Sequence, residues 1–260
     1  MGKRLSVLTL CSVLLAASAQ AGIILPKLKP QGLIKPQPAV EAQQEAPQPA
    51  PPAAPLDLHF PDGASGWSAP TIERERQQCR SLLAGVDMIF KPLPPEGTEG
   101  GCGGAAPIEV SAIDGVAISP VAVIDCHLAD ALHNWIAWSA KPAAQQNLGL
   151  KLVRIHNASS YVCRRRNNAA TGKLSEHAFM KALDISTLEF SDGSQTTVKG
   201  DWSGVKAALG VGGKAAFLAR IRRDACIRFT TVLGPGSDPY HGDHFHVDVI
   251  QRKNGYRICQ

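Results

Sequence analysis

Four histidines and one aspartate, gathered in two short segments, have the side chains of a metal site. His241, His244 and His246 fall within six residues near the end of the 260-residue chain, and His177 and Asp184 stand seven apart about sixty residues earlier. Zinc accepts imidazole nitrogens and carboxylate oxygens, and a catalytic zinc site uses three protein ligands and keeps a fourth position for water. If the segments converge, they indicate a metal-dependent hydrolase with at least one histidine left for proton transfer.

A strand over residues 244–250 would place two of these histidines on one face. Residues two apart in a strand point the same way, so His244, His246 and Asp248 share a side. Phe245, Val247 and Val249 then face the core. We therefore expect the Asp248 carboxylate to orient a metal-binding imidazole by accepting a hydrogen bond from it.

The other segment reads as a loop followed by a strand. A strand is predicted over residues 181–190, where Asp184 stands among Ala182, Leu183 and Ile185, and His177 lies in the loop before it. A neighbouring strand of the same sheet can therefore present Asp184 to the histidines.

The remaining pattern predicts an α+β fold with a small antiparallel sheet covered by helices. Residues 191–194 read as a hairpin turn, and Trp202 is expected in the core. Helices are expected over residues 69–86, from Pro120 through Ile136, and over residues 214–229. Further strands are expected over residues 110–118, 150–161 and 195–199.

The N-terminus has the three regions of a secretory signal peptide. Lys3 and Arg4 precede an apolar run, and small residues end at Ala21. Cleavage is expected after residue 21, because the apolar run is short for a membrane span. A signal anchor is the alternative. We expect no stable membrane insertion after cleavage, and a periplasmic or secreted location.

A proline-rich segment and a single domain follow. Residues 22–66 are rich in Pro, Gln and Ala and predict a disordered, extended linker, because they have few large apolar residues to bury. A ligand for a proline-reading domain is the alternative. Residues 67–260 have ordinary composition and a length that suits one domain.

Charge and cysteine content narrow the class of protein. Without residues 1–21 the chain keeps 25 basic and 22 acidic residues, a formal charge of +3, which gives no reason to expect a nucleic-acid partner. Six cysteines remain and predict three disulfides in an exported protein. Nearest-neighbour pairing joins Cys79 to Cys102 and Cys126 to Cys163, although 15 connectivities are open.

The chain resembles known families in several motifs. Residues 175–184, Ser-Glu-His-Ala-Phe-Met-Lys-Ala-Leu-Asp, resemble the Ser-x-His-x-x-Gly-x-Ala-x-Asp signature of zinc peptidases that include lysostaphin-type enzymes, D-Ala-D-Ala peptidases and the Hedgehog domain. Residues 244–246 resemble that group's His-x-His. Residues 160–167, 174–177, 182–185 and 231–246 look like the extensin-like C-terminal domain family of exported bacterial proteins.

Two features separate this chain from parts of that group. Met180 stands at the glycine of the signature, which predicts a different backbone turn or a bulkier pocket wall. His241 stands where many carboxypeptidases of the group have a glutamate. The resulting His-x-x-His-x-His pattern is similar to the penicillin-insensitive murein endopeptidases.

The resemblance implies a role for each candidate residue. It implies the fold shared by the lysostaphin, D-Ala-D-Ala peptidase and Hedgehog group, called LAS/Hedgehog-like below. It also implies one Zn²⁺ ion held by His177, Asp184 and His246. His244 and His241 would move protons. The other two candidates are Arg164, for the oxyanion or a substrate carboxylate, and Ser175, for a substrate hydrogen bond.

Each of these roles has a structural alternative. Arg164 could be a solvated charge within the run of residues 164–166, and Ser175 could brace the ligand loop. His127 and His133 are expected to have packing or surface roles on the second helix. His156 could line the cleft, but no partner stands at ligand spacing.

Together the motifs predict an exported zinc metallopeptidase that hydrolyses peptide bonds in peptidoglycan stem peptides, chiefly as a D,D-endopeptidase on crosslinks. One alternative is a non-catalytic module that keeps the fold and binds the cell wall. A second alternative is a structural spacer of the wall dominated by residues 22–60, the proline-rich tract.

Overall fold

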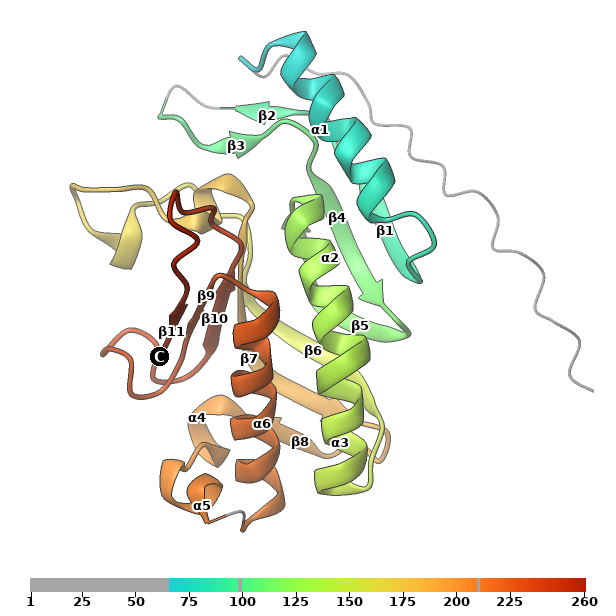
Figure 1. Cartoon of the computed structure of the whole chain (residues 1–260), viewed down its shortest axis with the longest axis vertical. Coiled ribbons are helices and arrows are strands. Elements are labelled where there is room, and N and C mark those ends of the chain that lie inside the picture. The colour runs from blue at the N-terminus through green and yellow to red at the C-terminus, as the bar shows by residue number, and fades with distance from the viewer. Residues whose placement is uncertain (1–65, 98–99, 210) are drawn as a thin grey trace, which may run out of the picture. The chain divides into compact units, whose positions relative to one another are not determined.

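The computed structural model describes residues 66–97, 100–209 and 211–260 as an α+β fold (Figure 1). The expected signal peptide, residues 1–21, and residues 22–65 of the expected linker lie outside the described residues. No described helix is long and apolar enough to cross a membrane.

Helices and strands are interspersed along the described chain. The helices are α1 (Ala69–Leu82), α2 (Cys126–Trp135), the π-helix η1 (Ile136–Ala140), α3 (Lys141–Leu148), the 3₁₀ turns η2 (Arg166–Asn168) and η3 (Glu176–Phe179), α4 (Val198–Asp201), α5 (Gly204–Ala208) and α6 (Gly213–Arg228). The strands are β1 (Met88–Pro92), β2 (Glu96–Gly97), β3 (Gly103–Gly104), β4 (Ile108–Ile113), β5 (Val116–Ile124), β6 (Leu152–Ser159), β7 (Ala182–Phe190), β8 (Gln195–Thr197), β9 (Thr231–Leu233), β10 (Phe245–Asp248) and β11 (Ile258–Cys259).

One mostly antiparallel sheet is the frame of the described fold. Its strand order is β1-β4-β5-β6-β7-β10-β9-β11, and β8 pairs with β7 as the ninth strand. Two pairs are parallel, β5 with β6 and β11 with β9. The expectation of a small sheet was therefore wrong, because the short strands β1, β9 and β11 extend it at both ends.

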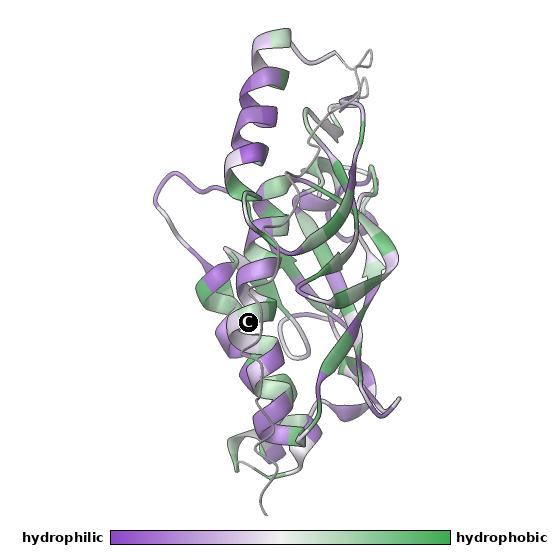
Figure 2. Ribbon diagram, turned by 90° about the vertical axis from the view of Figure 1, so that its right-hand side faces the viewer, coloured by the Kyte–Doolittle hydropathy of each residue, from purple (hydrophilic) through white to green (hydrophobic). Residues whose placement is uncertain are grey.

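Helices α2, α3 and α6 lie across one face of the sheet (Figure 1). The core between these layers buries large side chains such as Trp135, Phe190 and Phe217. Helix α1 is mostly hydrophilic along its length (Figure 2), and Cys79 is its buried residue. The central strands are thus covered on one side, while α1 adds little to the core.

The expected second helix begins later than predicted. Pro120 lies inside strand β5, and the helix starts only after Asp125, whose carboxylate accepts a hydrogen bond from the Leu128 backbone nitrogen at 2.8 Å. The strand expected over residues 110–118 is instead a hairpin of β4 and β5. It turns at Asp114 and Gly115, which both have positive φ, as two-residue hairpin turns require.

The disulfides differ from nearest-neighbour pairing. The bonds are Cys79–Cys126 and Cys102–Cys163, so the predicted pairs Cys79–Cys102 and Cys126–Cys163 were wrong. The reason is tertiary: α1 packs against α2 and brings Cys79 to the first residue of that helix. Three disulfides indicate an oxidising, exported environment.

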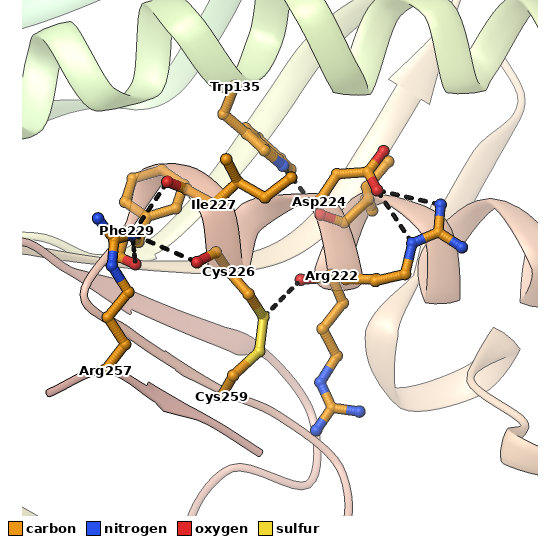
Figure 3. The surroundings of a disulfide bond; sticks show 10 residues. Trp135, Arg222, Asp224, Cys226, Ile227, Phe229, Arg257 and Cys259 are labelled. Atoms are coloured by element: carbon orange, nitrogen blue, oxygen red, sulfur yellow. Dashed lines mark hydrogen bonds and ion pairs between the residues drawn. A yellow bond between two sulfur atoms is a disulfide. The ribbon is translucent and has the colours of Figure 1, made fainter.

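The third disulfide fastens the C-terminal segment to α6. Cys226 near the end of α6 is bonded to Cys259 on β11 (Figure 3). Beside it, the Arg257 guanidinium donates to the backbone oxygens of Cys226, Ile227 and Phe229. An arginine at the end of a helix satisfies carbonyl groups that have no partner within the helix.

Met180 adopts a left-handed backbone conformation at the position where the signature has glycine. The residue ends turn η3 with φ 60° and ψ 23°, and its backbone nitrogen donates to the His177 oxygen. Its side chain is fully buried and lies beside Gly104. The left-handed turn that glycine would favour is thus kept, and the methionine gains packing against its conformational cost.

This conformation predicts an inverted order of stability at position 180. We expect the free energy of unfolding of Met180→Gly, measured by urea denaturation, to exceed that of Met180→Ala by about 1 kcal/mol. The reason is that only alanine is strained at positive φ. Both variants should be less stable than the wild type by about 2–4 kcal/mol, because a buried methionine is lost.

Ala219→Gly within α6 is the control, where φ is helical and glycine should cost up to about 1 kcal/mol. An alanine variant at position 180 that is more stable than the glycine variant would contradict the strained turn.

Candidate metal centre

The pairing of β7 with β10 brings the two ligand segments together. The strands are antiparallel, and Asp184 stands directly opposite His246. Both side chains are buried, while Val247 between His246 and Asp248 points into the hydrophobic core. The alternation of a strand therefore places His246 and Asp248 on the side of Asp184, as the sequence predicts.

Turn η3 adds His177 from the loop before β7. The turn starts after Ser175 and ends at Met180, so the chain reverses into β7 within a few residues. His177 is 1% exposed, and its ring centroid lies 5.1 Å from that of His246. Because the turn is short, His177 returns to the same end of β7 as Asp184.

Three donor atoms converge at this point. The His246 Nδ1 and Asp184 Oδ1 atoms are 2.9 Å apart, and His177 Nε2 lies 3.2 Å from each of them. Tetrahedral ligands about 2.0–2.1 Å from a zinc-sized ion stand about 3.3–3.4 Å from one another. The observed spacing is close to that arrangement, so these residues fit a metal ion.

The outer hydrogen bonds direct lone pairs into the site. His177 Nδ1 lies 2.6 Å from the Ser160 backbone oxygen, and His246 Nε2 lies 3.3 Å from an Asp248 carboxylate oxygen. Each of these nitrogens must donate, because its partner only accepts. With the outer nitrogens donating, the inner nitrogens face the Asp184 oxygen, where each can either donate a proton to the carboxylate or offer a lone pair to a bound cation.

Electrostatics favour positive charge at the same place. Burial alone would raise the pKa of Asp184, but hydrogen bonds from His177 and His246 hold it well below its usual range. Burial alone would lower the pKa of His246, yet its bonds to Asp184 and Asp248 raise it to about 9. The two carboxylates thus stabilise a cation among these side chains, whether a proton or a metal ion.

His244 and His241 stand beside the triad, each oriented by its own aspartate. His244 Nδ1 lies 2.8 Å from Asp243 Oδ1, and its Nε2 is 3.6 Å from Asp184 Oδ1. His241 Nδ1 lies 2.7 Å from Asp238 Oδ1. These bonds hold the Nδ1 protons and leave both Nε2 atoms as acceptors.

The environment of His241 favours its neutral form. Burial lowers the pKa of the imidazole, against the opposing effect of Asp238. The rings of His241 and His244 are 5.3 Å apart, and that of His241 is 5.6 Å from His246. The four histidines therefore form one cluster, with two on the Asp184 oxygen and two beside it.

A cavity of about 510 Å³ opens over this cluster. Arg164 and Ser175 line it together with the histidines. Arg164 is half-buried and makes no hydrogen bond or ion pair through its side chain with a described residue. Its neighbours differ, since Arg165 bonds the Gly172 oxygen and Arg166 pairs with Glu176 at 3.2 Å.

Ser175 is buried at the floor of the same cavity. Its backbone nitrogen donates to the Arg164 oxygen, which ties the ligand loop to the arginine segment. The Cys102–Cys163 disulfide ends one residue before Arg164. Backbone and disulfide together position the Arg164 side chain at the cavity wall.

His133 and His156 have partners away from the cavity. His133 lies 2.8 Å from Asp114 at the hairpin turn, and His156 lies 3.2 Å from Glu189 on β7. Neither lines the cavity, and neither does His127. Trp202 is half-buried against the core, with its ring packed edge-on to Phe245.

Sequence reasoning missed three supporting groups. These are the Ser160 carbonyl and the carboxylates of Asp238 and Asp243. The acidic residues stand three and one positions before the histidines that they orient. The two aspartates could therefore have been recognised from the sequence. The contact of His177 with Ser160 spans 17 residues and depends on the fold.

The fold and the site define an α+β protein with a buried His–Asp–His group able to hold a metal ion. Residues 77–260 match the family described as Extensin-like protein C-terminus, and the chain belongs to this family. No curated protein and no solved structure matches the chain.

Metal affinity should depend on the outer hydrogen bond of His246. We expect Asp248→Asn to weaken zinc binding about 10–100-fold, because the amide no longer fixes the imidazole as a carboxylate does. Competition with a chromophoric chelator measures the dissociation constant.

Asp238→Asn is the matched control, since Asp238 holds His241 in the same way but outside the triad. It should keep wild-type affinity. Equal weakening by the two variants would mean that His241 is itself a ligand.

Proposed function

We propose that this protein is an exported zinc metallopeptidase that hydrolyses peptide bonds in peptidoglycan, acting as a D,D-endopeptidase on crosslinks. The observation that carries the proposal is the convergence of His177 Nε2, Asp184 Oδ1 and His246 Nδ1 beneath an open cavity. Two nitrogens and one carboxylate oxygen suit zinc better than calcium or magnesium, which prefer oxygen. The proposal includes a relationship to the LAS/Hedgehog-like zinc peptidases.

A zinc ion bound there would supply Lewis acidity, which lowers the pKa of water and polarises a carbonyl group. His244 is the general base in this proposal. Its Nε2 faces Asp184 while Asp243 holds the opposite nitrogen, so the imidazole can take a proton from water beside the triad. The same nitrogen then delivers the proton to the leaving amine.

His241, Arg164 and Ser175 complete the proposed machinery. His241 lies beside His244 and passes protons to and from it, with Asp238 fixing its orientation. The Arg164 guanidinium binds the oxyanion or a substrate carboxylate, because it lines the cavity and its side chain bonds no described residue. Ser175 hydrogen-bonds substrate from the cavity floor.

The proposed location is the periplasm or the cell exterior. Three disulfides and the sequence features of a signal peptide support export. The proposed partner is the peptidoglycan stem peptide. Neither a nucleic acid nor a lipid bilayer is needed as a partner.

Substitution of His246 on β10 and of His244 just before that strand should separate metal binding from turnover. We expect His246→Ala to lose both zinc and the release of muropeptides from isolated sacculi. His244→Ala should keep one zinc per chain and slow release about 10²–10⁴-fold, because only proton transfer is lost. Mass spectrometry of metal and chromatography of products measure the two effects.

His156→Ala is the control, because this half-buried histidine pairs with Glu189 outside the cavity. It should retain zinc and activity. A wild-type protein that binds sacculi, holds zinc and releases no product would contradict the enzyme and favour a wall-binding module.

A further inference from the structure

A second hollow adjoins the metal site on the other side of His244. It has a volume of about 430 Å³ and is lined by Ser186, Thr187, Thr197, Lys199, Asp243 and His244. His244 also lines the cavity over the triad. One imidazole thus stands between two hollows.

Irregular pairing of β6 and β7 builds this second hollow. Thr187 pairs with His156 and Ile185 with Asn157, so Ser186 is an extra residue on β7. Ile185 and Leu188 are both fully buried although they are three apart. The bulge therefore leaves Ser186 and Thr187 outside the core together, and bulges of this kind recur beside active sites.

Lys199 is the cation among the described residues that line this hollow, and after the hydrogen bond from His244 its charge helps to lower the pKa of the Asp243 carboxyl group. Its side chain is exposed and makes no hydrogen bond or ion pair with a described residue. The nearby carboxylate of Asp243 is bound to His244. Thr197 is occupied as the cap of α4, where it accepts from the Gly200 nitrogen.

The two hollows are therefore alike in one respect. Each has a cationic side chain that makes no ion pair with a described residue, Arg164 over the triad and Lys199 beyond His244. A ligand that spans both hollows would place an uncharged bond near the triad and a carboxylate at each end. Charge-assisted hydrogen bonds to such carboxylates are the strong ones in proteins.

We propose that the hollow beyond His244 binds the second peptide arm of a crosslinked substrate through a carboxylate of that arm held by Lys199. The inference rests on the proposed function and deepens it, because it names the substrate as a peptide with anionic groups on both sides of the cut bond. A short peptide that ends next to the cut bond fills only one hollow.

The test compares binding of synthetic stem-peptide dimers to the zinc-loaded full chain. One dimer has free carboxylates on both arms, and two others have the carboxylates of one arm or the other amidated. We expect Lys199→Glu to weaken binding of the unmodified dimer about tenfold or more in calorimetry. Amidation of one of the two arms should weaken binding of the dimer to the wild type by the same factor. It should not further weaken binding of the dimer to Lys199→Glu.

Lys151→Glu is the matched control. It makes the same charge change at an exposed site just before β6, about 23 Å along the strand from Ala158 at about 3.3 Å per residue. It should bind the dimer as the wild type does, and circular dichroism should show both variants folded.

Several results would contradict the proposal that the hollow beyond His244 binds a second peptide arm. Equal affinity of wild type and Lys199→Glu would do so, as would equal weakening by Lys151→Glu, no effect of either amidation, or no binding by the wild type. Turnover is recorded separately. A wild type that binds the dimer through Lys199 without cleaving it would contradict the proposed hydrolase activity but support binding of the second arm.

Discussion

The register between β7 and β10 is the constraint on which the candidate site depends. It places Asp184 opposite His246, so two donor atoms meet without any contribution from a flexible loop. A shift of one residue would move His246 to the core side and Val247 into the cavity. Burial of Val247 and Phe245 opposes such a slip, and hydrophobic packing therefore maintains the geometry of the polar face.

The rest of the site is attached to this pair by local devices. A 3₁₀ turn returns His177 to the end of β7, and the Ser160 carbonyl fixes its ring. The Asp125 backbone nitrogen donates to the Met180 oxygen, which connects that turn to the start of α2. Each imidazole of the cluster has an oxygen partner on its outer nitrogen. The hydrogen bonds thus orient all four rings before any ligand arrives.

The ligand segments could be read from the sequence because their spacing is local. Alternation predicted β7 to within one residue, whereas the strand predicted over residues 244–250 is shorter as β10, and α6 followed from its apolar stripe. The start of α2 was misplaced because Pro120 suits the first turn of a helix as well as the exposed strand position that it occupies. Strands β9 and β11 are too short to show a period. Disulfide pairing and the second hollow depend on contacts between distant segments, which no local pattern contains.

The order of the disulfides has a consequence for how the chain matures. The bonds Cys79–Cys126 and Cys102–Cys163 interleave along the sequence. A chain that emerges N-terminus first exposes Cys79 and Cys102 together before either native partner is present. Oxidation in order of emergence would join the wrong pair, and thiol–disulfide exchange would then have to undo it. Where oxidation runs ahead of folding, correct maturation of this domain therefore requires disulfide exchange that replaces the first-formed pair.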